Sequence, residues 1–286
     1  MKVKELVNAL DLITGGRVIT STDDLFTGKN PFVVIKSSNI PGKAIVETPG
    51  LVYGDPEAEI KKIAVAMTLT ESCIELAGAT GVNVIITHHP IADAANSGGV
   101  TLENYLGLYN ISAIELHEAF HGLHPGLSFL HGHKAFRVDI KYGGIPGNIV
   151  YVGRALDDVN TLGDILDRLN KMMNLDKEYE LADAEKSILN YHEMYDSATA
   201  LSAQIILGSP DTPVDTILHI FPHTGFTSSH LVQAKNEHPE IDTVLATISR
   251  VNKESELVKK AEELNLNFIC GNSHSMEIYE NGLPLA

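Results

Sequence analysis

The stretch Val82-Asn-Val-Ile-Ile-Thr-His-His-Pro90 sets the organisation that we expect for the whole chain. Its apolar, largely β-branched residues follow Gly81 and predict a buried strand of a parallel sheet. This strand carries His88 and His89 to its carboxyl end, where open α/β sheets bind their ligands. Imidazole is the commonest protein ligand for transition metals, so the pair is a candidate metal site. The motif alone is equally compatible with a structural or surface role.

The composition narrows the classes of function. The chain has 286 residues, of which 44% are hydrophobic, as in a globular protein with two domains or one α/β unit with an insertion. The formal net charge of -16 argues against nucleic acid as a partner, because binding to phosphates needs a basic surface. An anionic small-molecule substrate is still compatible with this charge, because a bound cation reverses the local field.

The sequence also bears on the cellular compartment. Cys73 and Cys270 are too few for a disulfide framework and favour a reducing environment. The first residues lack the apolar core of a signal peptide, and no apolar run reaches the ~18 residues of a membrane helix. We therefore predict a cytoplasmic protein without a membrane partner.

The hydrophobic pattern predicts an α/β protein with two related βα halves, whose mostly parallel or mixed sheets are flanked by helices, and with a central insertion. In the first half we expect strands at 62–69, 82–87 and 111–116 and helices at 71–79, with Thr70 as its N-cap, and at 102–109. In the second half we expect strands at 203–207, 216–221, 243–247 and 267–270 and helices at 228–236 and 254–265. The predicted domains are residues 1–139, an inserted or linking segment over 140–212, and residues 213–286.

Two further histidine-bearing segments follow predicted strands. They are His117-Glu-Ala-Phe-His121 and Gly271-Asn-Ser-His-Ser-Met-Glu277. His274 and Glu277 are three residues apart, so a helical turn places both on one face. An imidazole beside a carboxylate suits a borderline divalent metal, although such a pair is also common by chance. Three histidine-bearing loops at strand ends indicate a metal site more strongly than any one of them.

The segments Gly50-Leu-Val-Tyr-Gly-Asp-Pro-Glu-Ala-Glu-Ile-Lys-Lys-Ile63 and Ile86-Thr-His-His-Pro90 resemble the opening of the NGG1-interacting-factor-like family. These are dinuclear-metal, ring-forming proteins that are also labelled GTP cyclohydrolase I type 2 homologues. The resemblance covers residues 50–121 and, more weakly, residues 214–286. It implies a homohexamer, built as a trimer of dimers, and a nucleotide or other heterocyclic phosphate as the substrate class.

On this resemblance, five side chains are the expected metal ligands: His88, His89, His121, His274 and Glu277. His121 stands where the family has an aspartate, and His274 is one residue closer to Glu277 than in the family motif. Replacing a carboxylate by imidazole softens the site and favours zinc, nickel or iron over manganese or magnesium. We therefore expect one or two divalent ions per chain, with zinc first and iron, nickel or manganese as alternatives.

Two main hypotheses for function follow. The preferred one is a metal-dependent hydrolase of a nucleotide or another phosphorylated or heterocyclic small molecule, in which Glu277 orients water and His117 or His223 moves a proton. The alternative is a non-enzymatic, metal-binding, ring-shaped regulatory or interaction protein, and a scaffold without metal is a third option. Glu118 is a candidate for the missing carboxylate, and a solvated glutamate is an equally good interpretation.

The other histidines carry weaker signals. His131 and His133 lie in a segment where pocket lining and plain loop surface are equally compatible with the sequence. His219 follows the pattern of a strand, and we expect it to be structural or exposed.

Overall fold

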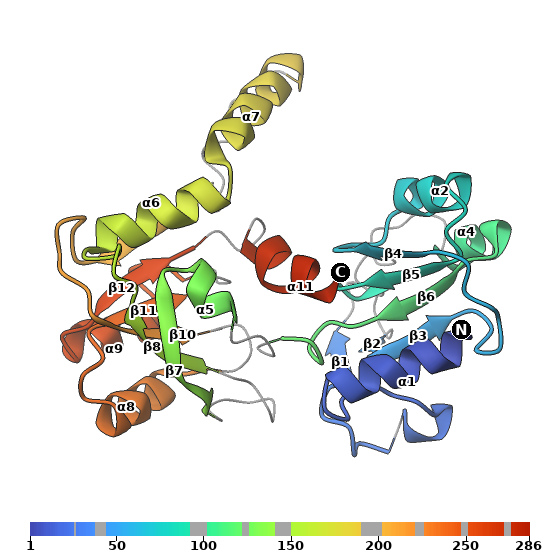
Figure 1. Cartoon of the computed structure of the whole chain (residues 1–286), viewed down its shortest axis with the longest axis horizontal. Coiled ribbons are helices and arrows are strands. Elements are labelled where there is room, and N and C mark those ends of the chain that lie inside the picture. The colour runs from blue at the N-terminus through green and yellow to red at the C-terminus, as the bar shows by residue number, and fades with distance from the viewer. Residues whose placement is uncertain are drawn as a thin grey trace. The chain divides into compact units, whose positions relative to one another are not determined.

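The computed structural model describes residues 1–25, 27–37, 44–91, 102–121, 126–140, 150–189, 202–220, 226–246, 251–271 and 276–286. The chain forms two compact units, of which the first comprises Met1–Leu123 with Asn281–Ala286 and the second comprises His124–Glu280. Each unit has its own main sheet with flanking helices (Figure 1). The predicted α/β class with mixed sheets is confirmed. Among the described residues, no helix combines the length and the apolar character that crossing a bilayer requires.

The main sheet of the first unit has four strands. Their spatial order is β3 (Gly50–Tyr53), β6 (Ser112–Glu115), β5 (Val84–Thr87) and β4 (Ile63–Ala66). Strands β4, β5 and β6 are parallel, and β3 is antiparallel to β6. Every residue of β5 is buried, which explains its uninterrupted apolar sequence.

Helices cover this sheet. One face packs on α2 (Glu71–Ala79) and α4 (Leu102–Tyr109), with Ile74, Ile85 and Leu106 in their shared core. Thr70 caps α2 by accepting a hydrogen bond from the backbone N–H of Cys73 at 3.2 Å, as the sequence predicts. The unit also contains α1 (Val3–Ile13), the 3-10 turn Thr22–Asp24, the hairpin of β1 (Val34–Ser37) and β2 (Ala44–Glu47), and α11 (Leu283–Leu285). A π-helical turn, Ile278–Gly282, precedes α11.

The sheet of the second unit has six strands. Their order is β7 (His133–Ile140), β8 (Val150–Ala155), β10 (Thr216–Ile220), β11 (Thr243–Ala246), β12 (Asn267–Cys270) and β9 (Gln204–Leu207). Strands β10, β11 and β12 are parallel, and antiparallel β8 and β9 flank them. The two main sheets therefore share one design, three parallel strands extended by antiparallel ones.

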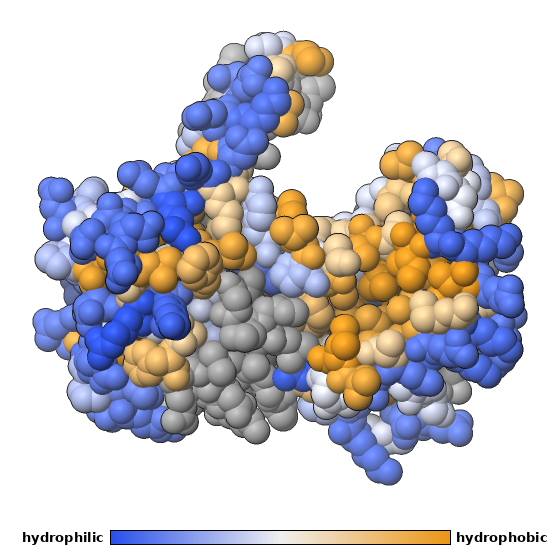
Figure 2. Space-filling model, in the orientation of Figure 1, coloured by the Kyte–Doolittle hydropathy of each residue, from blue (hydrophilic) through white to orange (hydrophobic). Residues whose placement is uncertain are grey.

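Helices pack on both faces of this second sheet. One core layer joins Leu218 and Val244 to α8 (Ser228–Glu237) and α9 (Glu256–Glu263). The opposite layer joins Ile217 and Leu245 to α6 (Leu162–Met172). Helices α5 (Gly126–Leu130) and α7 (Leu175–Leu189) complete the unit. Figure 2 shows mainly hydrophilic residues on α7, whereas hydrophobic residues gather over β4, β5 and β6 of the first unit.

The compact units differ from the predicted boundaries at residues 139 and 212. The segment over 140–212 contributes β8 and β9 to the second sheet, where β8 pairs with β10 and β9 pairs with β12. Strands at the antiparallel margins of a sheet carry short apolar patterns that do not reveal their partners. The sequence pattern therefore does not show that these two strands extend the parallel core of the second sheet.

The core of the second unit also holds buried ionisable groups. The side chains of His131, His133, His219 and Glu280 are all 0% exposed. Burial, and then the charge of His131, lowers the pKa of His133 to about 3. Burial also lowers the pKa of His219 well below its usual value. At Gly153 an added Cβ would overlap Nδ1 of His133 and lie 2.7 Å from the carbonyl oxygen of Lys134, so only glycine leaves room for this ring.

Candidate metal centre

Three histidines of the first unit converge beyond the carboxyl ends of neighbouring parallel strands. His88 follows β5, and His117 and His121 follow β6. The backbone N–H of His88 donates to the carbonyl oxygen of Ala66 at 2.9 Å, so the ladder continues past the end of β5 and fixes the start of the loop. The three histidines each offer a ring nitrogen within 4.8 Å of the other two.

The ring of His88 is buried and oriented by the backbone. Its Nδ1 lies 3.0 Å from the carbonyl oxygen of Leu116. A carbonyl oxygen only accepts, so the hydrogen-bond network assigns the proton to Nδ1. The lone pair then lies on Nε2, which is the arrangement seen in metal-binding histidines.

The ring of His121 is held in the same way by a carboxylate. Its Nδ1 lies 3.3 Å from Oε2 of Glu118, and its side chain is 1% exposed. The Nε2 atoms of His121 and His88 are 3.1 Å apart. With both protons on Nδ1, two lone pairs face each other, and only a cation, a proton or a metal ion, removes the repulsion. Two nitrogen ligands of a tetrahedral zinc ion are roughly 3.3 Å apart, so the pair fits a metal.

His117 adds a third imidazole, and two carboxylates lie near its ring. Its ring centroid lies 5.1 Å from that of His88 and 4.7 Å from that of His121. Its Nδ1 is 3.3 Å from Oε1 of Glu47 and 3.8 Å from Oε1 of Glu118. Carboxylates beside ligand histidines orient the rings and raise their basicity. The donor set of buried imidazoles and carboxylates therefore suits a divalent metal.

His89 lies beside this group and not within it. Its Nδ1 is 2.6 Å from Oγ1 of Thr68, and its ring centroid is 5.4 Å from that of His88. It is not among the side chains whose ligand atoms lie within 4.8 Å of one another. Its predicted role as a metal ligand stays a prediction.

Three further predicted site residues are His223, His274 and Glu277. His223 and His274 fall outside the described residues. Glu277 belongs to the second unit, where its side chain is 9% exposed. The roles of His274 and Glu277 as ligands, and of His223 and Glu277 in catalysis, stay predictions.

Sequence reasoning missed two carboxylates near these histidines. Glu47 contacts His117, as described above. Glu115 is 2% exposed, and its two oxygens accept hydrogen bonds from the backbone N–H groups of Thr48 and Ile91, each at 3.0 Å. It thereby holds both the turn before β3 and the loop after the His-His-Pro motif. The sequence did contain a signal for Glu115, because it is a carboxylate within the apolar run 111–116 and buried charges are rare without partners.

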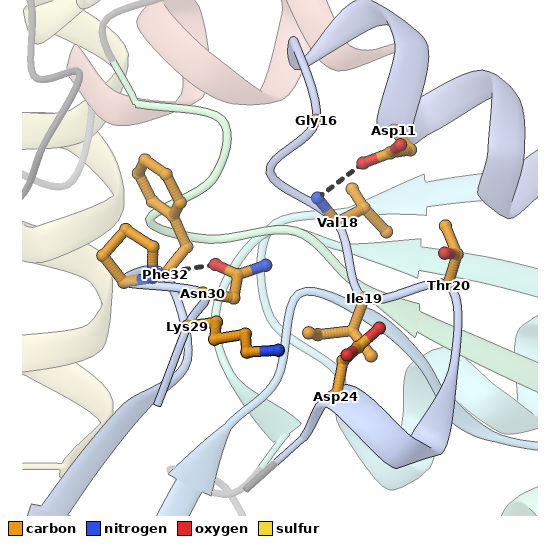
Figure 3. A pocket seen from close by; sticks show the side chains of 10 residues that line it. Asp11, Gly16, Val18, Ile19, Thr20, Asp24, Lys29, Asn30 and Phe32 are labelled. Atoms are coloured by element: carbon orange, nitrogen blue, oxygen red, sulfur yellow. Dashed lines mark hydrogen bonds between the residues drawn. The ribbon is translucent and has the colours of Figure 1, made fainter. Parts of the chain in front are cut away.

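A cavity of about 370 Å³ opens in the same unit (Figure 3). Its described lining includes Asn30 and Phe32 and contains no histidine. Asn30 donates to the carbonyl oxygen of Arg17 at 2.9 Å, and the guanidinium of Arg17 lies 4.8 Å from the centroid of the Phe32 ring. The same guanidinium donates to the carbonyl oxygens of Ala119 and His121, at 3.4 and 3.5 Å. Arg17 thus links the cavity wall to the loop that carries His121.

Comparison with known proteins agrees with this architecture. Residues 36–115 match the model of the family Duf34/NIF3 (NGG1p interacting factor 3). A hypothetical protein of Staphylococcus aureus has a similar structure, with a TM-score of 0.60 and 16% identity over 99% of this chain and 89% of that chain. A Bacillus cereus protein related to NIF3 gives a TM-score of 0.56 and 12% identity over 97% and 90% of the two chains.

A third solved structure, reduced HcgD from Methanocaldococcus jannaschii, gives a TM-score of 0.55 and 17% identity over 100% of this chain and 91% of that chain. No curated protein sequence matches the chain. At these identities the structural likeness shows the fold, and the sequence match rests on residues 36–115, which include His88. The match over residues 36–115 supports the predicted resemblance to NIF3-like proteins, and the shared fold agrees with it.

Proposed function

We propose that the chain is a metal-dependent hydrolase whose divalent ion is held by His88 and His121, with His117 beside them to move a proton. One observation carries the proposal: the Nε2 atoms of His88 and His121 approach to 3.1 Å while both Nδ1 atoms face acceptors. Ring nitrogens in this arrangement point lone pairs at a shared cation. Imidazole suits zinc, iron or nickel better than magnesium or calcium, and we place zinc first.

The side chains around the ion supply orientation and proton transfer. A bound ion of this class lowers the pKa of coordinated water and polarises a carbonyl, imine or phosphoryl oxygen. Glu118 and the carbonyl of Leu116 fix the ring planes of His121 and His88. His117 contacts Glu47, whose carboxylate stabilises the protonated ring, so His117 is suited to accept or deliver a proton.

The substrate class that we propose is a nucleotide or another phosphorylated or heterocyclic small molecule. Its support is the resemblance to proteins labelled GTP cyclohydrolase I type 2 homologues. The formal net charge of -16 is compatible with such an anion because a bound divalent cation reverses the field locally. We also carry the homohexamer of this family forward as a proposal, which light scattering of the purified protein tests.

Metal analysis and turnover test the proposal together. Untagged protein is expected to carry one or two divalent ions per chain and to hydrolyse a compound in a panel of nucleotides and phosphoesters. His88→Ala and His121→Ala are expected to lose the ion of this site and turnover, whereas His238→Ala, which removes a histidine that contacts Glu240, keeps both. The same assays on Glu277→Gln test its predicted role as a ligand.

The outcomes separate the two hypotheses for function. Stoichiometric metal without turnover of any compound would contradict the hydrolase and favour a non-enzymatic, ring-shaped metal-binding protein. Metal content that is the same in His88→Ala, His121→Ala and the unmodified chain would contradict the metal site itself.

A further inference from the structure

The second unit contains its own closed group of metal-ligand side chains. His131, His219 and Glu280 each offer one ligand atom, and these atoms all lie within 4.8 Å of one another. Nε2 of His131 is 2.8 Å from Oε1 of Glu280, and Nε2 of His219 is 3.8 Å from the same oxygen. The two ring centroids are 4.5 Å apart. All three side chains are 0% exposed, so the group is closed to solvent.

Three distant segments build this group. His131 lies between α5 and β7, His219 lies within β10, and Glu280 lies in the π-helical turn after β12. In the sheet, His219 is in register with Leu245 of β11, which is in turn in register with Ile269 of β12. On its other side His219 is in register with Tyr151 of β8, so the imidazole occupies a row of buried core residues. Burying a polar ring in such a row is unfavourable unless the ring gains a partner.

Within the described chain, hydrogen bonding does not satisfy two members of the group, His131 and Glu280. Neither ring nitrogen of His131 and neither carboxylate oxygen of Glu280 takes part in a hydrogen bond there, although Nε2 of His131 and Oε1 of Glu280 approach to 2.8 Å as an ion pair. Each unsatisfied buried polar group costs about 1–3 kcal/mol, and more when it is charged. A simple ion pair between His131 and Glu280 would point an N–H group at the carboxylate and would still leave the second oxygen without a partner.

We propose that His131, His219 and Glu280 bind a zinc-class divalent ion that stabilises the second unit. Two imidazoles and one carboxylate suit zinc, cobalt or iron, whereas calcium and magnesium prefer sets of oxygen ligands. One ion satisfies a ring nitrogen of His131 and a carboxylate oxygen of Glu280 that hydrogen bonds leave unused. Since no ligand reaches solvent, the ion has a structural role and takes no part in the hydrolysis proposed above.

His133 supplies a matched control for this assignment. It is as fully buried as the three ligands, but its ring centroid lies 6.0 Å from that of His219 and its nitrogens are outside the ligand group. Replacing it therefore removes a buried imidazole from the same core without removing a proposed ligand.

The test uses the full chain with both His88 and His121 replaced by alanine, so that the first site does not contribute metal. After loading with Zn²⁺ and removal of free ion, mass spectrometry is expected to find about one zinc per chain. Adding His219→Gln or Glu280→Gln is expected to weaken zinc binding at least about tenfold. Adding His133→Gln is expected to leave the zinc content unchanged. Circular dichroism checks that each variant is folded.

A second measurement does not depend on changing the core. Chelation of zinc from the chain that lacks His88 and His121 is expected to lower the Tm of the second unit by several degrees, and added zinc restores it, because a ligand of the folded state stabilises that state. A zinc-free chain whose Tm does not respond to chelator or zinc would overturn the proposal. Full zinc content in both His219→Gln and Glu280→Gln, or loss of zinc in His133→Gln, would overturn the ligand assignment.

Discussion

The two units of the chain each bury a group of histidines, but they hold the rings in different ways. In the first unit, His88 and His121 each direct Nδ1 at an acceptor, the carbonyl of Leu116 and the carboxylate of Glu118. In the second unit, His131 has no hydrogen bond among the described residues. Rings that are oriented before an ion arrives form a site that keeps its geometry while ligands exchange. A ring without such a partner, as at His131, gives a site whose stability depends on the ion.

The two groups of histidines also occupy different positions in their sheets. His88 and His117 follow the carboxyl ends of parallel strands, where α/β proteins bind their substrates. His219 lies inside β10, in register with Leu245, and is part of the core. The comparison therefore predicts reactive chemistry in the first unit and stabilisation in the second. Four substitutions, in order of expected effect, test this difference.

Loss of a first-unit ligand has the largest expected effect. His88→Ala removes an imidazole whose Nε2 is aimed at the proposed ion. We expect metal affinity to fall on the order of 100-fold or more, because losing a ligand costs more affinity than losing a side chain that only orients a ligand. Competition with a chromogenic chelator measures the change. The Tm of the second unit is expected to stay the same, and a fall in that Tm would show that the two groups do not act separately.

Loss of an orienting carboxylate is expected to have a smaller effect. Glu118→Ala removes the carboxylate that faces Nδ1 of His121, so neither the tautomer nor the orientation of the ring is fixed. We expect metal affinity to fall roughly 10–100-fold. Glu254→Ala removes a glutamate that is 87% exposed and serves as the control. Equal affinity in the Glu118 variant and the unmodified chain would mean that pre-orientation does not distinguish the first unit from the second.

A glycine beside His133 tests how tightly the core around the second group is packed. Gly153→Ala places a Cβ against Nδ1 of His133 and against backbone atoms of Lys134 and Ala135, so we expect a loss of about 1–3 kcal/mol from the free energy of unfolding. Urea unfolding followed by circular dichroism measures it. Adding His133→Ala is expected to recover part of the loss, because the ring clash is removed and the backbone clash remains. No recovery would place the strain in the backbone alone.

The sequence was most informative where the signal is local. The buried strand β5, the cap at Thr70 and the placement of His88 at a strand end follow from neighbouring residues, and the structure has all three. The contact of Glu47 with His117 was not predictable, because it joins segments about 70 residues apart. The same holds for His219 and Glu280, each of which looks like an isolated polar residue until the sheet of the second unit brings them together. Convergence of distant segments is a property of tertiary packing and has no local pattern.

The prediction with the smallest expected effect concerns Glu57, a surface carboxylate that contrasts with the buried Glu280. Hydrogen bonds from Lys2, and then Lys4, lower the pKa of Glu57 to about 2. Because the pKa is lower in the folded chain than the ordinary value of 4.5, Glu57 stabilises the fold above pH 4.5, and this contribution is lost as the pH falls toward 2. Glu57→Gln is therefore expected to lower the Tm slightly at pH 7 and by much less at pH 2, and salt is expected to shrink the difference because the pair is solvent-exposed. A difference of the same size at pH 2 would assign it to packing of α1 and not to charge. A surface carboxylate can be lost at little cost because water solvates its partners, whereas a buried one, as in the second unit, leaves its neighbours with no such substitute.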